Sequence, residues 1–349
     1  MSGGVDSSVA AALAAVEHGP ENVVGATLRL WGGASDSGCC SVADVEDARR
    51  VADRLGLVHH VFNLADDFEE RVVGPYVAGH AAGLTPNPCI ECNRSIKFDR
   101  LLERARRLGF DGVATGHHAR LVTGPSGRHR LMRGADPAKD QSYVLAMLGQ
   151  DQLARVLFPI GGMTKAEVRA EAERLGLRTA AKPDSQDVCF IRSDTGRARF
   201  LGDRLELHPG RLVDHATGTP VGEVEAVELV TVGQRRGMGH GTDGRRRYVT
   251  AVDVRAGEVR VGPPEAAMTD AVDLHRITWV DGAVRPGTPV VAQCSAHGAP
   301  LGATLEEPGV PGQLRVRFHR PARRVAPGQT VALYDASDPD AVIGSGVAA

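Results

Sequence analysis

Lysine is nearly absent from this 349-residue chain. Of its 41 basic residues, 37 are arginine and four are lysine, at Lys97, Lys139, Lys165 and Lys182. So strong a bias indicates a coding preference for arginine, and a position that keeps lysine is therefore a candidate for a specific role. Two of the lysines lie in polar stretches, Lys139-Asp140-Gln141 and Lys182-Pro183-Asp184-Ser185-Gln186.

Other features are absent as well. No apolar run is long enough to cross a membrane, and the N-terminus has neither a basic region nor a signal-type apolar run with a cleavage site. We therefore expect a cytoplasmic protein without a membrane partner. In that reducing compartment its six cysteines indicate free thiols, metal binding or catalysis rather than structural disulfides.

The net charge of -2 does not indicate a nucleic-acid binder. Charge can still be local, and arginine gathers in the C-terminal half of the chain. This clustering fits either a solvated face or a nucleic-acid surface. Its members are Arg235, Arg236, Arg245, Arg246, Arg247, Arg315, Arg317, Arg320, Arg323 and Arg324.

The chain opens on a glycine-serine turn, Ser2-Gly3-Gly4-Val5-Asp6-Ser7-Ser8, followed by an alanine-rich segment. Glycine lets the backbone approach an anion closely, and the unpaired N–H groups of a helix start attract negative charge. The turn predicts a phosphate cradle for a nucleotide, with a glycine-rich helix cap as the alternative. No Gly-Lys-Ser/Thr follows, which excludes the phosphate loop of kinases and GTPases. The motif resembles the pyrophosphate loop of enzymes that split ATP into AMP and pyrophosphate.

In enzymes with such a loop a buried strand leads into it, whereas here only Met1 precedes Ser2. We expect either that the start codon lies upstream or that the first strand is missing. A missing central strand would leave backbone groups unpaired and apolar surface uncovered, which costs several kcal/mol. A chain extended upstream is therefore expected to have a higher melting temperature.

The length fits about two to three domains, and the 42% apolar content is ordinary for a globular protein. The first half alternates apolar runs with helical patterns, as in a parallel sheet covered by helices. The sequence predicts helices over 9–18, 41–56, 68–80, 98–108, 141–148 and 164–175, strands over 23–30, 58–64 and 112–115, and a hairpin over 121–131.

Near residue 195 short valine-rich runs separated by glycine turns replace the helical pattern. The expected fold class is α/β, with an N-terminal parallel-sheet domain that lacks its first strand. We place this catalytic domain at 1–195, a small mostly β domain at 196–265 and a β-barrel-like domain at 266–349.

Cys89-Ile90-Glu91-Cys92 follows a loop with three breakers, Gly83-Leu84-Thr85-Pro86-Asn87-Pro88. A structural zinc site usually needs a second close pair, which Cys39-Cys40 would have to supply in space. A thioredoxin-type motif would follow a strand directly, and a buried inert pair is a further alternative. The loop setting favours exposed, reactive thiols. Cys189 lies on an apolar run and, taken alone, fits a core position better than a catalytic one.

Seven motifs in order resemble those of the tRNA-specific 2-thiouridylase family, which replaces O2 of the wobble uridine (U34) of tRNA with sulfur. The resemblance covers the chain from residue 2 to about residue 346. The motifs are Ser2 to Ser8, Thr85-Pro86-Asn87-Pro88-Cys89-x-x-Cys92-Asn93, Ile96-Lys97-Phe98, Thr115-Gly116-His117, Lys139-Asp140-Gln141-Ser142-Tyr143, Asp184 to Ile191, and Gly233-Gln234-Arg235-Arg236-Gly237.

The resemblance implies an adenine-nucleotide hydrolase-like N-terminal domain that uses ATP with Mg2+. The C2 oxygen of uracil is a very poor leaving group, so it must first be converted to an AMP ester. The residues implied to bind ATP are Ser2, Gly3, Gly4, Val5, Asp6, Ser7, Leu28 and Gly116.

The resemblance also assigns the sulfur chemistry. Cys189 would carry a persulfide, and Cys92 would attack it to release sulfur or would form the resolving disulfide. A cysteine desulfurase or a sulfur-relay protein would be the donor. Some family members have aspartate where this chain has Cys89. The three thiolates of Cys89, Cys92 and Cys189 could instead hold a [4Fe-4S] cluster with one open iron.

The RNA partners implied are the anticodon arms of lysine, glutamate and glutamine tRNAs, with the target base flipped from its stack. Asn87, Pro88 and Cys89 would line the flipped base. Further tRNA contacts would come from His117, Lys139, Asp140, Gln141, Arg317, Phe318 and Gln329, with phenylalanine in place of the more usual tyrosine. The alternatives are another adenylating ligase or synthetase with this loop, a catalytically impaired tRNA-binding protein, and a redox protein.

Overall fold

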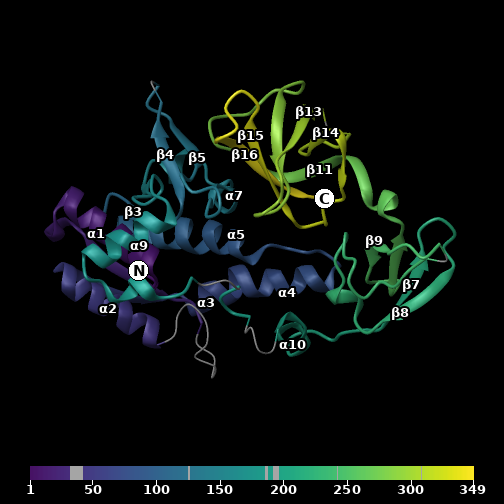
Figure 1. Cartoon of the computed structure of the whole chain (residues 1–349), viewed down its shortest axis with the longest axis horizontal. Coiled ribbons are helices and arrows are strands. Elements are labelled where there is room, and N and C mark those ends of the chain that lie inside the picture. Colours follow the sequence, from purple (N-terminus) through teal and green to yellow (C-terminus); the bar gives the residue numbers. More distant parts are fainter. Residues whose placement is uncertain (32–41, 125, 185–187, 192–195, 242, 308) are drawn as a thin grey trace. The chain divides into compact units, whose positions relative to one another are not determined.

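In the computed structural model the described residues are 1–31, 42–124, 126–184, 188–191, 196–241, 243–307 and 309–349. They form two compact units, which are described separately (Figure 1). Unit 1 comprises Met1–Val72, Cys89–Gly196 and Asp340–Val342, and unit 2 comprises Val73–Pro88, Arg197–Pro339 and Ile343–Ala349. Among the described residues, no helix has both the length and the apolar character needed to span a bilayer.

Unit 1 is the α/β part of the chain, and its two strand pairs are parallel. Strand β1 (Val24–Arg29) pairs with β2 (Val58–Asn63), and β3 (Val113–Ala114) pairs with β6 (Val156–Leu157). A hairpin of β4 (Ala119–Thr123) and β5 (His129–Arg133) follows β3. The helices are α1 (Val5–His18), α2 (Val42–Leu55), α3 (Ala65–Phe68), α5 (Pro88–Cys92), α6 (Leu101–Arg107), α7 (Ser142–Leu145), α8 (Gln150–Leu153) and α9 (Lys165–Arg174).

Local sequence signals explain where the main helices of unit 1 begin and end. Helix α1 ends at Gly19, which has a φ of 82°. Glycine adopts this positive φ without the strain that a side chain would cause. Helix α9 begins with a capping box in which the Thr164 hydroxyl accepts from the Glu167 N–H and the Glu167 side chain returns to the Thr164 N–H. The apolar faces of both helices share one core, which contains Val5, Val9, Ile160, Val168 and Ala172.

The strand pairs β1–β2 and β3–β6 are separate two-stranded sheets, and β1 and β3 border the same cleft of about 1080 Å³. Met1 lies beside β1, where its amino group donates to the Ala26 carbonyl and its own carbonyl accepts from the Thr27 hydroxyl. Apolar side chains of α1 and α6 line other parts of the cleft. The parallel sheet expected from the sequence is therefore present as two pairs with a cleft alongside both.

Two predicted elements differ in extent. The segment after the Gly83–Pro88 loop is helical at once, because Pro88 is the first residue of α5 and η3 (Asn93–Arg100) continues the helix into α6. Helix α7 is shorter than the predicted 141–148. The Asp140 carboxylate accepts from the N–H and hydroxyl of Ser142 at its start, and the chain turns at Gly149 to begin α8.

Unit 2 combines two short α-helices, a small sheet and a closed barrel. Helix α4 (Gly74–Ala81) leads into the 83–88 loop, and α10 (Gly196–Gly202) precedes the sheet. The four sheet strands have the order β8-β7-β10-β9. These strands are β7 (Gly210–Asp214), β8 (Pro220–Val224), β9 (Tyr248–Asp253) and β10 (Glu258–Gly262).

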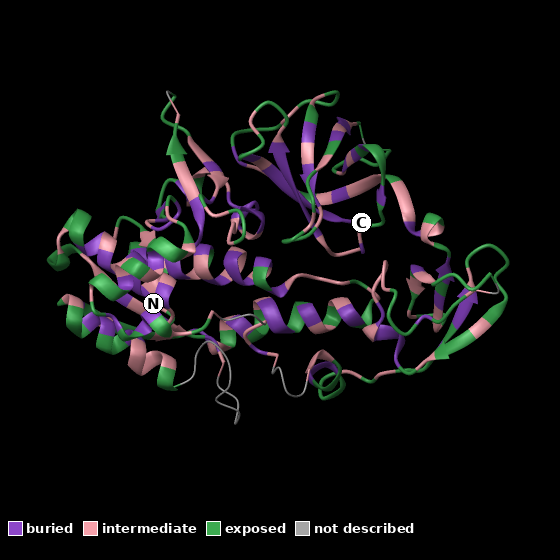
Figure 2. Cartoon of the chain, viewed as in Figure 1, coloured by how far each residue is buried: buried purple, intermediate pink, exposed green. Residues whose placement is uncertain are grey.

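The barrel has six strands in the order β11-β14-β13-β12-β15-β16, closed by the pairing of β11 with β16. Their bounds are β11 (Met268–Trp279), β12 (Pro289–Gln293), β13 (Leu301–Glu306), β14 (Leu314–Arg323), β15 (Thr330–Asp335) and β16 (Ala341–Ala348). Burial alternates along β13 and the first half of β14, whereas β15 and β16 are buried at nearly every position (Figure 2). Together with the parallel strands of unit 1, the barrel confirms the α/β fold class with a C-terminal β-barrel.

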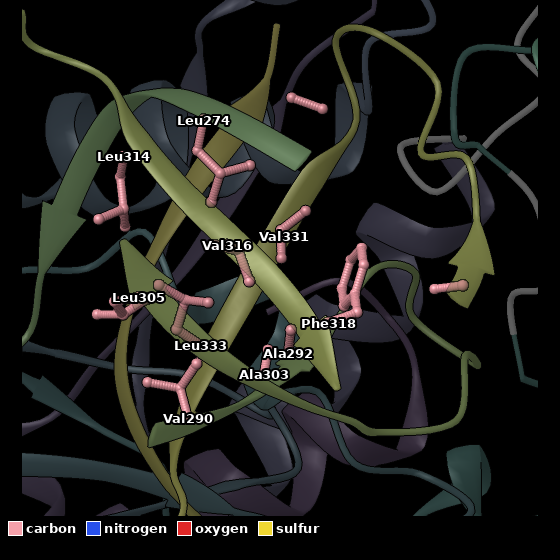
Figure 3. Packing of buried hydrophobic residues seen from close by; sticks show 12 residues of the cluster. Leu274, Val290, Ala292, Ala303, Leu305, Leu314, Val316, Phe318, Val331 and Leu333 are labelled. Carbon is pink, nitrogen blue, oxygen red and sulfur yellow. The ribbon is translucent and has the colours of Figure 1, made fainter. Parts of the chain in front are cut away.

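Phe318 is a core residue of the barrel rather than an exposed ring. Its side chain is 5% exposed and packs in the cluster that includes Val316, Ala303 and Val331 (Figure 3). Because strand side chains alternate between faces, the neighbouring Arg317 points outward, where its guanidinium pairs with Glu306. The family resemblance implied tRNA contacts for both residues, but in this structure the buried Phe318 ring is not available for stacking on a base.

Replacing Phe318 tests this placement. We expect Phe318→Ala to lower the free energy of unfolding by about 3–5 kcal/mol and Phe318→Leu to lower it by less than about 1.5 kcal/mol, as for a packed ring. Arg317→Ala, one residue away on the exposed face, should change it by about 0.5 kcal/mol or less. Urea denaturation measures all three. Equal, small effects for Phe318→Ala and Arg317→Ala would show that the ring does not pack in the core.

His80 carries a pH-dependent contribution to the stability of unit 2. Its ring is 2% exposed, stacks edge-on against Tyr76 and contacts the Glu228 carbonyl at 3.2 Å through Nδ1. Burial lowers the pKa of His80 to about 4, although the Glu228 carbonyl opposes the shift. The imidazole is therefore neutral in the folded protein at pH 7.

Because the unfolded chain binds a proton near pH 6.5 and the folded chain does not, stability falls as pH falls below that value. Between pH 8 and pH 5 we expect His80 to account for a loss of about 2 kcal/mol. Urea denaturation of the protein and of His80→Gln at both pH values gives the difference. An identical pH dependence in the two proteins would contradict this assignment.

Candidate functional site

The turn before α1 forms an open helix start. Gly4 precedes α1 in an extended conformation, and no side chain caps the helix at this point. The serine hydroxyls bond within the turn: Ser7 Oγ accepts from the Ser2 N–H, and the Ser8 hydroxyl donates to the Gly4 carbonyl. An uncapped helix start presents N–H groups and a partial positive charge, which suit an anion such as a phosphate.

Two glycines allow other backbone segments to approach this turn. Gly3 has a φ of 71°, and a Cβ there would lie 2.4 Å from the Asp44 carbonyl oxygen. Gly116 approaches the first turn of α1, and its Cβ would lie 2.6 Å from the Ser7 nitrogen. Any larger residue at Gly116 would have to displace the helix start.

The cleft beside this turn contains every lysine of the chain. Lys97, Lys139, Lys165 and Lys182 all line it, and its described lining residues include no arginine. The volume of about 1080 Å³ is enough for a nucleotide. Of the predicted nucleotide-binding residues, the lining includes Ser2, Gly4, Val5, Asp6, Ser7, Leu28 and Gly116, while Gly3 shapes the turn.

Carboxylates balance these cations in the cleft. Lys165 Nζ lies 2.7 and 2.8 Å from the two oxygens of Asp6 and 2.8 Å from Asp184 Oδ1. Asp184 also accepts from Lys139 at 2.8 Å and Arg169 at 2.9 Å. Burial raises the pKa of Asp184, but hydrogen bonds from Lys139 and Lys165 outweigh it, and the pKa is lowered to about 2. The carboxylate is therefore ionised at neutral pH.

His118 and Gln141 connect the cleft to the start of α1. His118 is 3% exposed, and its Nε2 lies 3.2 Å from Asp6 Oδ1. Burial of the Asp6 carboxyl raises its pKa, but the hydrogen bonds from His118 and Lys165 lower it overall. Gln141 accepts from the His118 N–H and donates its own N–H to the His118 carbonyl, both at 2.9 Å. Gln141, predicted to contact tRNA, thus holds His118, which in turn bonds Asp6 in the first turn of α1.

The other predicted tRNA contacts of unit 1 are His117, Asp140 and Lys139, and they differ in how far they reach solvent. His117 lines the cleft, bonds the Thr115 hydroxyl at 2.8 Å, and is neutral because burial, with Lys97 and His118 nearby, lowers its pKa well below the usual value. Asp140 is only 8% exposed, and its carboxylate accepts from Arg133 and from the Gly134 and Ser142 N–H groups. Lys139 is 40% exposed and keeps an open side toward solvent.

The three cysteines of interest differ in exposure. On α5, Cys89 is exposed and Cys92 is buried, so the predicted exposure of both thiols is wrong for Cys92. Surrounding protein raises the pKa of the Cys89 thiol even though its surface reaches solvent, and Lys97 opposes the shift. Cys189 is partly buried, and the ring of the adjacent Phe190 packs edge-on against Phe68.

The ligands of the proposed iron–sulfur site are not assembled among the described residues. Within the described ranges, no three His, Cys, Asp or Glu side chains are grouped closely enough to hold a metal ion. Cys89, Cys92 and Cys189 are all described, so as placed they do not form an iron–sulfur site. Cys39 and Cys40, the residues needed for a structural zinc, lie outside the described residues.

In unit 2 the loop that carries Asn87 and Pro88 is fixed by the barrel. The Gln329 side chain donates to the Thr85 carbonyl, and the Thr85 N–H donates to the Pro327 carbonyl at 2.7 Å. A Cβ on Gly328 would lie 3.2 Å from the Thr85 nitrogen, so the two segments are in close contact. Gln329, predicted to contact tRNA, is placed here as a support for the 84–88 loop.

Sequence reasoning assigned no site role to three residues that the structure places in the cleft network: His118, Lys165 and Asp184. Their partners are distant in sequence, so no local pattern reveals the contacts. The scarcity of lysine was the available signal, because Lys165 is one of only four lysines and all four line the cleft.

Three family models match consecutive parts of the chain. A tRNA methyl transferase HUP domain matches residues 1–193, a tRNA methyl transferase PRC-barrel domain matches 198–263, and an aminomethyltransferase beta-barrel domain matches 269–348.

Several curated proteins match nearly the full chain, and each is named tRNA-specific 2-thiouridylase MnmA. The protein of Roseiflexus sp. (strain RS-1) is 45% identical, covering 99% of this chain and 97% of the relative. The protein of Mycolicibacterium smegmatis is 47% identical, with 97% and 95% covered. The protein of Kineococcus radiotolerans is 49% identical, with 96% and 93% covered.

Gly116→Ala tests the close contact at the helix start. The new Cβ must push against the backbone of Asp6 and Ser7, so we expect the affinity for ATP and for inorganic pyrophosphate to fall by about tenfold or more, or about 1.4 kcal/mol. Calorimetric titration measures both.

Gly162→Ala is the matched control, because a Cβ there has no heavy atom within 4 Å. It should bind as the unchanged protein does. Unchanged affinity in Gly116→Ala would mean that the ligand does not use this helix start.

Proposed function

Since the chain belongs to the tRNA-specific 2-thiouridylase family, we propose that it activates the C2 oxygen of the wobble uridine with ATP and then replaces that oxygen with sulfur. The family membership makes it a sulfurtransferase that acts on tRNA uridine. The adenylation step, the persulfide and the roles of individual residues are the parts proposed here.

The cleft of unit 1 is the observation that carries the ATP step. It combines an uncapped helix start, the close backbone approach of Gly116 and all four lysines in one space. ATP is a substrate with four negative charges, and such a site would bind its phosphates. The uridine O2 attacks the α-phosphorus, the bond to the β-phosphate oxygen breaks, and pyrophosphate leaves. The products are pyrophosphate and a uridine with AMP on O2.

The lysines have a direct part in this step. Negative charge on the β- and γ-phosphates grows as pyrophosphate leaves, and ammonium groups fixed beside it stabilise that charge. Mg2+ would share this charge in the family reaction. The only acidic side chain of the cradle is that of Asp6, which would be its ligand if one of the contacts from Lys165 were released.

Sulfur transfer follows from two thiols. The Cys92 thiolate attacks the inner sulfur of a persulfide on Cys189, a Cys92–Cys189 disulfide forms, and hydrosulfide leaves. The hydrosulfide attacks C2 of the activated uridine, and AMP departs with the former oxygen. An external thiol must then reduce the disulfide, which returns both cysteines for the next cycle. The donor of the persulfide sulfur would be a cysteine desulfurase or a sulfur-relay protein.

The tRNA would be recognised by both units. Asn87, Pro88 and Cys89 would border the flipped base, supported by the contact of Gln329 with the loop. Lys139 and Arg317 have exposed charge that suits the phosphate backbone of the anticodon arm. Lysine, glutamate and glutamine tRNAs are the proposed substrates. We propose the domain limits 1–195, 196–265 and 266–349 for these parts.

Nucleoside mass spectrometry of unmodified glutamate tRNA is the experiment that tests the reaction. The protein is incubated anaerobically with ATP, Mg2+ and sulfide or a persulfide donor. We expect 2-thiouridine only when ATP is present, with stoichiometric release of pyrophosphate. Cys92→Ser and Cys189→Ser should lower product formation from the persulfide donor by about a hundredfold or more, because each removes a reacting sulfur.

Cys294→Ser is the matched thiol control, because Cys294 lies against the barrel core and burial raises its pKa to about 11. It should leave the rate unchanged. Product formation by Cys92→Ser or Cys189→Ser at the normal rate from the persulfide donor would contradict the relay. Product formation without ATP would contradict the activation step.

A further inference from the structure

Lys165 occupies a shared position between two carboxylates. It is the first residue of α9, fixed there by the Thr164 capping box, and its side chain is only 12% exposed. Its ammonium group contacts both oxygens of Asp6 in the phosphate cradle and one oxygen of Asp184. Asp6 and Asp184 belong to segments almost 180 residues apart in sequence, and Lys165 joins them directly.

The ammonium group has no donor to spare. It has three N–H bonds, and three carboxylate oxygens lie 2.7 to 2.8 Å from it. A phosphate oxygen that takes one of these donors must displace a carboxylate oxygen. Both carboxylates can tolerate the exchange, because Asp6 retains His118 at 3.2 Å and Asp184 retains Lys139 and Arg169.

Asp184 lies at the end of a segment that ion pairs and hydrogen bonds hold in place before Cys189. It lies five residues before Cys189, and the residues just before it are held by other contacts. Lys182 pairs with Asp44 and Asp47 of α2, and Arg169 of α9 donates to the Ala180 and Lys182 carbonyls. The contacts of Asp184 are therefore the last described anchors on the path toward Cys189.

We propose that Lys165, by exchanging a carboxylate contact for a phosphate contact, links occupation of the phosphate cradle to the presentation of Cys189. An anion in the cradle draws Lys165 away from Asp184, which loosens the anchor before Cys189 and makes that thiol more accessible. The inference rests on the proposed function, since it assumes that the cradle takes phosphates and that Cys189 carries the sulfur. Its consequence is that the sulfur-bearing thiol becomes available when the nucleotide site is filled.

Lysine suits this role better than arginine does. An ammonium is a compact point charge on a flexible stem, and it can turn its donors from one oxygen to another. The planar guanidinium fork would hold one carboxylate in a fixed bidentate pair. In a chain where 37 of 41 basic residues are arginine, lysine at this position is consistent with a contact that must be exchanged.

The test uses inorganic pyrophosphate as the probe and no tRNA. Alkylation of Cys189 by iodoacetamide is followed by peptide mass spectrometry in the full chain, with Cys294 in the same digest as the internal reference. We expect saturating pyrophosphate to raise the Cys189 rate by about threefold or more while Cys294 is unaffected. In Lys165→Gln, pyrophosphate should bind more weakly and leave the Cys189 rate unchanged even at saturation.

Asp184→Asn is the decisive second variant. Its affinity for pyrophosphate by calorimetric titration should equal or exceed that of the unchanged chain, because a competitor for Lys165 is weakened. Its Cys189 rate should be high already and should not respond to pyrophosphate. Arg174→Gln is the matched control: it removes another cation–carboxylate pair of α9, with Glu171, and should behave as the unchanged chain does.

Three outcomes would overturn the inference. One is an unchanged chain whose Cys189 rate ignores pyrophosphate, and another is a Lys165→Gln protein that keeps the full response. The third is an Asp184→Asn protein that loses as much pyrophosphate affinity as Lys165→Gln does, since Asp184 would then only support the cradle. Because no tRNA is present, these results are independent of 2-thiouridine formation, which tests the proposed function itself.

Discussion

The charge balance of the lysine-lined cleft is the constraint on which the α/β unit depends. An anion site needs fixed positive charge, and when the site is empty that charge must be neutralised by the protein. Four lysines and a helix start supply the positive side, and Asp6, Asp44, Asp47 and Asp184 supply the negative side. Because these carboxylates come from α1, α2 and the segment before Cys189, the pairs that neutralise the cleft also join the elements around it.

Close backbone approach is the second constraint, and it works with the first. Gly3 allows the Asp44 backbone to lie against the cradle, and Gly116 allows the end of β3 to lie against the start of α1. A side chain at either position would separate elements that the ion pairs draw together. A side chain added at Gly3 or Gly116 and the removal of one ion pair would therefore both disturb the packing around the start of α1.

The sequence was sufficient to predict the elements whose signals are local. Three such signals predicted elements that the structure confirms. They are the glycine after α1, the Thr164-x-x-Glu167 box and the apolar runs of β1 and β2. The turn before α1 was also predicted from its contiguous glycines and serines, and its binding of phosphate stays a prediction. Contacts such as Lys165 with Asp6, 159 residues apart, have no local signal and required the fold.

Residues with two compatible roles were harder to assign. Phe318 fits both a stacking surface and a barrel core, and only the register of β14 decides that it faces inward. Asp140 and Gln141 are polar and were expected on the RNA surface, yet the backbone around His118 and Ser142 uses their hydrogen-bonding groups. Residue type and spacing do not distinguish a polar side chain that binds a ligand from one that satisfies a buried backbone.

Cys89 and Cys92 differ in exposure although they lie on the same helix. Both lie on α5, within one turn, but the first is exposed and the second is buried. A thiol that receives sulfur from another protein must be reached from outside, whereas a thiol that displaces hydrosulfide from a persulfide benefits from exclusion of water, which would otherwise compete for the activated base. Buried Cys92 meets the second requirement, and partly buried Cys189 lies between the two. Under the proposed relay, access must therefore be controlled at Cys189, the thiol nearest in sequence to the ion pairs of Asp184.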